Sequence, residues 1–144
     1  MSASNNSENL LLNTIFRNSG IPNLGDTTGI VPSTANGSLY MSLHTADPGE
    51  AGTQSTSETA YTGYARINVA RTTGGWTVTN NSVSPVAAIT FGECTAAAGG
   101  PITHASIGTG VANELLYSGA VTPNITMAVG VQPVLKTTST ITED

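Results

Sequence analysis

The sequence predicts a mainly β protein: an antiparallel β-sandwich of jelly-roll type, with about eight short strands and one short N-terminal helix. Over much of the chain apolar and polar residues alternate with a period of two, which is typical of half-buried strands. Clusters of Gly, Pro, Asn and Ser interrupt these segments about every 8 to 15 residues, as turns between strands would. Thr and Val, which favour a pleated surface, are frequent.

The first element expected is a helix of about three turns at residues 7–18. Ser7 is placed to cap its N-terminus, and Arg17 and Gly20 favour its C-terminal end. Its apolar residues fall on one face: Leu11, Leu12, Ile15 and Phe16. Because so short a helix is marginally stable alone, this face must pack on its own domain, on another copy or on a different protein.

Residues 20–37 contain Gly, Pro, Asn or Asp at almost every third position and show no period, which predicts a long loop or extended arm. Loops of this length usually carry function or reach a neighbour. We therefore divide the chain into residues 1–37, a helix followed by an arm, and residues 38–144, the β-sandwich.

The rest of the chain is expected to consist of strands separated by turns. In residues 39–44 apolar and polar residues alternate, so that His44 falls on the polar face of its strand. Residues 80–85 are dense in turn-forming residues and are predicted as a loop. The predicted strands are residues 39–44, 64–71, 76–79, 86–91, 102–107, 115–120, 126–129 or beyond, and 134–141.

The composition excludes several classes of partner. The chain has 144 residues, the size of one domain, and only 9% of them are charged. Four basic against nine acidic residues give a net charge of −5, which is incompatible with the basic patch that nucleic-acid binding needs. No run reaches the about 18 apolar residues of a membrane span, and the first residues do not resemble a secretory signal. We therefore expect neither nucleic-acid nor membrane partners.

No catalytic or metal-binding constellation is predicted. His44 and His104 have no partners at the spacing of a known metal site or of a Ser/His/Asp set, and Cys94, the one cysteine, is expected to be a buried small apolar residue. The carboxylate pairs that glycoside hydrolysis could use are Glu58 with Glu93 and Asp47 with Glu50. Aromatic residues, which form sugar platforms, make up only 5% of the chain. We expect no enzyme activity, no cofactor and no metal.

Two of the four basic residues, Arg66 and Arg71, fall on or at the end of one predicted strand. Tyr and Arg dominate the energetics of protein interfaces, so these residues and Tyr64 are candidates for an assembly interface. The alternative is a surface pair that neutralises Glu58 or Glu93. With the helix face included, the candidate interface residues are Leu11, Leu12, Ile15, Phe16, Arg17, Tyr64, Arg66 and Arg71.

Several segments follow one another in a recognisable order. They are LLLNTIFRN (10–18), LYMSLHTADPGEAGTQ (39–54), YTGYARINVAR (61–71), GWTVTNNSVSPVAAITFGECT (75–95), ITHASIGTG (102–110), LLYSGAV (115–121) and ITED (141–144). This succession resembles a family of small virion structural proteins of tailed bacteriophages, often described as tail-fibre proteins. The resemblance covers nearly the whole chain and implies a place in the virion, after synthesis in the cytoplasm of the host bacterium, with no catalytic residues. The loop at residues 20–37 departs from the family pattern as an added arm.

Size separates the roles that a virion protein could have. A fibre that spans distance needs length, coiled coils or repeats, whereas a capsid decoration or cement protein can be one small domain. We therefore expect a decoration protein, a homotrimer, whose helix and arm bind the major capsid protein or another virion protein and stabilise the head. The alternative is a tail-fibre or tail-tip component, and a more distant one is a small carbohydrate-binding or hydrolytic module. The low charge favours burial among neighbours, because charged groups would have to be desolvated there.

Overall fold

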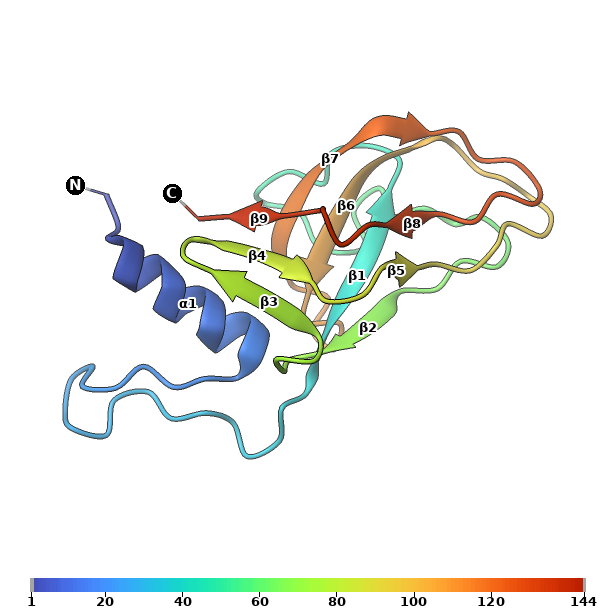
Figure 1. Cartoon of the computed structure of the whole chain (residues 1–144). Coiled ribbons are helices and arrows are strands. Elements are labelled where there is room, and N and C mark those ends of the chain that lie inside the picture. The colour runs from blue at the N-terminus through green and yellow to red at the C-terminus, as the bar shows by residue number, and fades with distance from the viewer. Residues whose placement is uncertain (1, 144) are drawn as a thin grey trace. The chain divides into compact units, whose positions relative to one another are not determined.

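The computed structural model describes residues 2–143, in which one helix precedes nine strands (Figure 1). The strands form a four-stranded sheet in the order β2-β1-β6-β7, a three-stranded sheet β3-β4-β9 and a two-stranded sheet β5-β8. The predicted class, a mainly β antiparallel sandwich with one N-terminal helix, is confirmed. The elements are α1 (Asn5–Arg17), β1 (Ser38–His44), β2 (Ile67–Ala70), β3 (Trp76–Thr79), β4 (Ser82–Pro85), β5 (Ile89–Thr90), β6 (Ile102–Gly108), β7 (Leu115–Ile125), β8 (Val134–Leu135) and β9 (Ile141–Thr142).

The chain folds into two compact units. The first comprises residues 2–38, 70–88 and 136–143, which include the helix, the arm and the sheet β3-β4-β9. The second comprises Leu39–Val69 and Ile89–Leu135, which supply the four-stranded sheet and the pair β5-β8.

The predicted helix is confirmed, with ends that differ from those expected. Ser4, not Ser7, is the N-cap: its Oγ accepts a hydrogen bond from the Ser7 backbone N–H at 3.2 Å. The helix ends before Gly20, because Asn18 adopts the left-handed conformation at φ 52° and its N–H bonds to the Asn13 carbonyl. Asn tolerates this conformation better than most residues, so it replaces the expected glycine.

In the first unit the helix packs on the β3–β4 hairpin. Leu12 and Phe16 are fully buried, and the Phe16 ring meets Trp76 edge to face, with ring centroids 4.9 Å apart. Val83 of β4 is also buried. Of the three partners left open for the apolar helix face, the structure therefore shows its own domain.

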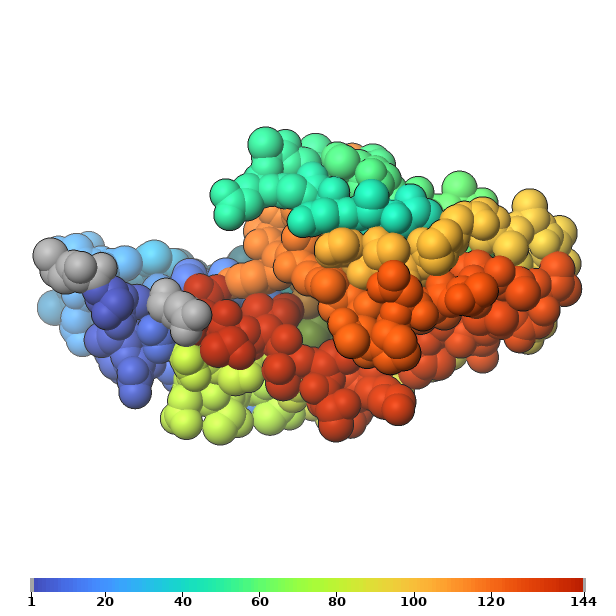
Figure 2. All heavy atoms as spheres, turned by 90° about the horizontal axis from the view of Figure 1, so that it is seen from above, coloured from blue at the N-terminus to red at the C-terminus, as the bar shows by residue number. Residues whose placement is uncertain are grey.

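The prediction that residues 80–85 form a loop is wrong. Only Asn80 and Asn81 form the turn, with Asn80 at φ 54°, and the following four residues pair with β3 as β4. β4 pairs in turn with β9, and Figure 2 shows the dark-red C-terminal segment lying on the yellow-green hairpin. This short strand escapes the pattern because serine and proline surround its one buried aliphatic residue, Val83.

The second unit is built on β1 and β6. These strands pair antiparallel with Met41 opposite Ile107 and His44 opposite His104, which matches the strands predicted at residues 39–44 and 102–107. The apolar core of this unit contains Leu39, Met41, Leu43, Tyr61, Ile89, Phe91, Cys94, Ile102, Ile107 and Met127.

Other predicted strands are shorter than expected or absent. The strand predicted at residues 64–71 begins only at Ile67, because the preceding residues form a turn in which the Tyr64 N–H bonds to the Tyr61 carbonyl. The segment predicted at residues 86–91 is a strand only at β5. Residues 126–129 are not a strand but lead into a turn with Gly130 at φ 88°. The segment at residues 134–141 is interrupted by a turn, so β8 and the start of β9 share it.

Candidate functional site

The apolar helix residues of the predicted interface lie mainly in the interior of the first unit. Leu12 and Phe16 are fully buried and Ile15 is half-buried, so these side chains face the chain's own core. Leu11 is the exception, with 41% of its surface exposed. The helix face therefore does not form one continuous exposed stripe.

Two arginines fasten the C-terminal end of this helix. Arg71 donates from Nε to the Ile15 carbonyl and from Nη2 to the Thr14 carbonyl, both at 2.6 Å. Arg17 donates from Nε to the Trp76 carbonyl at 3.1 Å. The last carbonyls of a helix have no partner within it and carry its negative dipole end, so a guanidinium suits both needs. Arg71 thus caps two of the last carbonyls of α1, in addition to the C-cap residue Asn18.

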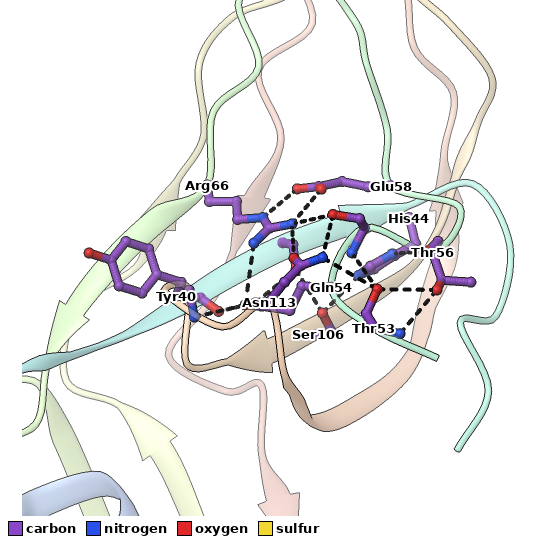
Figure 3. A network of polar contacts seen from close by, with 12 residues as sticks. Tyr40, His44, Thr53, Gln54, Thr56, Glu58, Arg66, Ser106 and Asn113 are labelled. Atoms are coloured by element: carbon purple, nitrogen blue, oxygen red, sulfur yellow. Dashed lines mark hydrogen bonds and ion pairs between the residues drawn. The ribbon is translucent and has the colours of Figure 1, made fainter. Parts of the chain in front are cut away.

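Arg66 and Tyr64 both contact Glu58 in the second unit, and Figure 3 shows Arg66 beside Glu58. Arg66 donates from Nε and Nη2 to the two carboxylate oxygens of Glu58, each at 2.7 Å, and the Tyr64 hydroxyl donates to the same carboxylate at 2.7 Å. Arg66 also donates to Asn113 Oδ1 at 2.7 Å and to Ser55 Oγ at 3.1 Å. Arg66 therefore neutralises Glu58, as one of the two alternatives expected, and an interface role for Tyr64, Arg66 and Arg71 stays a prediction.

These contacts explain the titration behaviour of the cluster. Burial alone would raise the pKa of Glu58, but hydrogen bonds from Arg66 and Tyr64, with the arginine charge, hold it below its usual range. The same ion pair raises the pKa of Arg66. Burial, aided by the neighbouring carboxylate, raises the pKa of Tyr64. The cluster stays ionised as a bidentate pair near neutral pH.

A row of buried polar side chains runs beside this cluster (Figure 3). The Gln54 amide donates to Ser42 Oγ at 3.1 Å, Ser42 and Ser106 hydroxyls lie 2.7 Å apart, and Ser106 Oγ lies 2.7 Å from His44 Nε2. His44 Nδ1 lies 2.8 Å from the Thr56 carbonyl, which can only accept. Neutral His44 is therefore protonated at Nδ1, and each hydroxyl donates toward the imidazole.

The position of His44 agrees with the predicted polar face, but its burial was not predicted. The residue lies on the polar side of its strand, but this side is covered, and His44 has no exposed surface. Burial lowers the pKa of His44, and the contact with the Thr56 carbonyl and the nearby Glu58 only partly offset this effect. Residues 54–58, named here the covering segment, lie against this side of the strand. In this segment Gln54 Oε1 accepts a hydrogen bond from the Gly110 N–H, and the Gln54 amide donates to the Tyr40 carbonyl.

The Ser106–His44 contact has the distance of a nucleophile and its general base, yet its setting is that of a structural network. Ser106 is 2% exposed and His44 is fully buried, so the hydroxyl faces protein atoms. The imidazole is oriented by a backbone carbonyl rather than a carboxylate, and Glu58 is held by Arg66. These hydrogen bonds hold the covering segment against β1 of the sheet.

Sequence reasoning missed Gln54, Ser106 and Asn113. Polar residues at Ser42, His44 and Ser106 on neighbouring strands were the available signal, because directly opposed side chains share one face of a sheet. Nothing near Gln54 or Asn113 in the sequence marks them as partners of these strands.

Within residues 2–143, no three His, Cys, Asp or Glu side chains gather as a metal site would require. None of the described helices has the length and apolar character to cross a membrane.

Comparison with known proteins gives one finding. A search of the curated proteins returned no match. The profile of a protein family described as "Podophage GP4 fiber I protein gp80" matches residues 2–142, nearly the entire chain. This agrees with the resemblance seen in the sequence and with the mainly β architecture. The chain belongs to the podophage GP4 fiber I protein gp80 family and is a structural protein of a bacteriophage virion.

Proposed function

We propose that the chain is a structural component of the tail fibre, the role that the sequence analysis kept as its alternative. The observation that carries the proposal is the family match, which extends over residues 2–142 and is described as a fibre protein. A match of this extent favours a fibre role for the chain as a whole.

The surface supports a role in assembly. The arm in the first unit exposes Leu24 at 56%, Ile30 at 45% and Val31 at 63% of their surfaces. The Ile21–Ile30 bridge and the Asn18 side chain, which bonds to Ser33, order this arm. Apolar groups held in place on an ordered segment are available to a neighbouring virion protein at a small cost in conformational entropy.

The polar network supports a structural rather than a chemical role. Its polar atoms are engaged with one another, and its Ser106–His44 pair, which has the distance of a nucleophile and base, is buried. We therefore keep the absence of enzyme activity as part of the proposal. Glycoside hydrolysis would need an accessible pair of carboxylates, and in the candidate pair Glu58 with Glu93 the first carboxylate is occupied by Arg66.

A capsid decoration protein remains the second candidate, because the chain has only 144 residues and one 13-residue helix, short for a spanning fibre. The homotrimer and the binding of helix and arm to the major capsid protein are part of this second proposal. In either role the partners are virion proteins.

The number of copies per particle tests the fibre proposal against the decoration proposal. Quantitative mass spectrometry of purified virions, calibrated on the major capsid protein, should find the chain in a small number of copies. Hundreds of copies per particle would contradict the fibre role and favour decoration of the head.

A further inference from the structure

β7 lies at an edge of the four-stranded sheet in the second unit. β7 is the longest described strand, with 11 residues, and it ends the order β2-β1-β6-β7, so it pairs with β6 alone (Figure 1). None of its residues is fully buried. The bridge between Thr53 and Glu114 stops one residue before β7 begins.

This edge lacks the charged side chains by which many sheets prevent pairing with another chain. Its sequence, LLYSGAVTPNI, contains no charged residue. The other described edge strands are short, with four residues in β2 and β3 and two in β5, β8 and β9. The pairing of β7 with β6 slips between His104 and Ile102 and again between Ile107 and Gly108, which leaves residues 117–120 regular. An exposed, uncharged edge with a regular stretch is a template for another strand.

Gly119 points to close approach by an external group. The residue is exposed, its φ is outside the left-handed region, and an added Cβ would have no other atom within 4 Å. Neither backbone conformation nor packing in this chain therefore requires glycine here. Glycine within a strand weakens it, and it often marks a site where another chain comes near.

We propose that β7 pairs antiparallel with β7 of a second copy of this chain, about a two-fold axis through Ser118. Such an axis places residues of the same face opposite one another. Tyr117 then lies opposite the partner copy's Gly119, and both residues fall within the regular stretch 117–120. An aromatic ring covering a cross-strand glycine is a stabilising combination.

Charge also favours a second copy as the occupant. The chain carries a net charge of −5, so two copies repel each other overall. The neutral β7 edge is where two copies meet without like charges opposite each other. The proposal extends the assembly role proposed above by naming one contact, and its tests use the purified protein, so its failure would leave the place of the chain in the virion untouched.

Cysteine cross-linking tests the register. In the proposed pairing the two Ser118 Cα atoms lie about 5 Å apart, within reach of a disulfide, whereas the two Ala120 Cα atoms lie about 14 Å apart, beyond the about 7 Å limit. Under mild oxidation Ser118→Cys should form a covalent dimer and Ala120→Cys should not. The native Cys94 is buried, and the unaltered chain serves as control. Equal cross-linking of both variants, or of neither, would overturn the pairing.

Two further variants separate pairing from folding. Ser118→Lys places two lysines opposite each other and should raise the dimer dissociation constant at least about tenfold in sedimentation or light scattering. Thr73→Lys, at an exposed turn of the first unit, changes the net charge equally and should leave dimerisation intact. Gly119→Ala should weaken the dimer while preserving or raising the thermal stability of the monomer. A wild-type chain that stays monomeric at every concentration, or a trimer without the Ser118→Cys cross-link, would overturn the proposal.

Discussion

Arg66 joins segments of the second unit that lie far apart in the sequence. Its side chain donates hydrogen bonds to Ser55 and Glu58 of the covering segment and to Asn113 in the loop before β7. The side chains of Arg66 and Glu58 are only 20% and 17% exposed. Each therefore depends on the other, because a partly buried charge without its partner is unfavourable.

Replacing Arg66 by alanine should lower the free energy of unfolding by about 2 kcal/mol, because it leaves the Glu58 carboxylate and the Asn113 amide without their main donor. Urea denaturation followed by circular dichroism measures this loss. Glu50→Gln, at an exposed position, should change the stability by less than about 0.5 kcal/mol. Equal stability of the Arg66 variant and the native chain would show that the network is dispensable.

Stability should fall as the pH drops below about 6.5, first through His44 and then through Glu58. Both groups have a lower pKa in the folded chain, so the unfolded chain binds more protons as the pH falls. The His44 contribution is complete above about pH 6.5, and the Glu58 contribution is complete above about pH 4.5; each is lost as the pH falls through the folded-state value.

Urea denaturation at pH 7.5 and pH 5.5 isolates the His44 contribution. His44→Asn should flatten the dependence between these two values, whereas His104→Asn, which leaves His44 in place, should retain it. A native chain with the same free energy of unfolding at both pH values would contradict the burial of a neutral His44.

The sequence predicted the burial of some single residues and not of others. The burial of Trp76 and Cys94 follows from their apolar character. The burial of His44 could not be inferred from alternation, because alternation tells which side of a strand a residue occupies but not what covers that side. The covering segment is held by Gln54 and Arg66, whose partners come from distant positions.

Among the elements, α1 depends most on groups outside itself. A helix of 13 residues is marginal in isolation, and its packing on Trp76 and its capping by Arg71 both come from residues more than 50 positions away. The sequence predicted the helix and its apolar face but not this cap, because the distance in sequence hides the contact.

Arg71→Ala should lower the free energy of unfolding by about 2 kcal/mol, since two short charge-assisted hydrogen bonds to the Thr14 and Ile15 carbonyls disappear. Hydrogen exchange should show faster opening of the last turn of α1. Arg71→Lys should restore only part of the stability, because an ammonium group lacks the planar fork. Lys136→Ala removes one positive charge at an exposed site and should have little effect.

The strands were predictable where alternation continued and ambiguous where turn-forming residues entered it. β1, β3 and β6 agree closely with the predicted segments. β4 was missed because Asn, Ser and Pro surround it. The strand predicted at residues 115–120 ends too early, because β7 continues to Ile125 through Pro123, a residue typical of turns. Pairing partners, rather than local preference, decide such segments.

At the scale of the whole molecule, the low charge and the neutral β7 edge suit a protein that works among neighbours. Since no charged residue lies on β7, self-association should depend only weakly on salt. Sedimentation at low and high ionic strength should give dimer dissociation constants within about threefold of each other, once changes in net repulsion are included. A tenfold or larger weakening at high salt would indicate that ion pairs, not the strand edge, hold the copies together.

We propose that this chain is a structural component of the phage fibre, and its location in the particle decides whether this is so. Particles made with and without the chain would be compared by electron-microscopic reconstruction. The fibre proposal predicts that density is lost at the tail fibres while the head is unchanged. Loss of density on the capsid surface, with intact fibres, would contradict it.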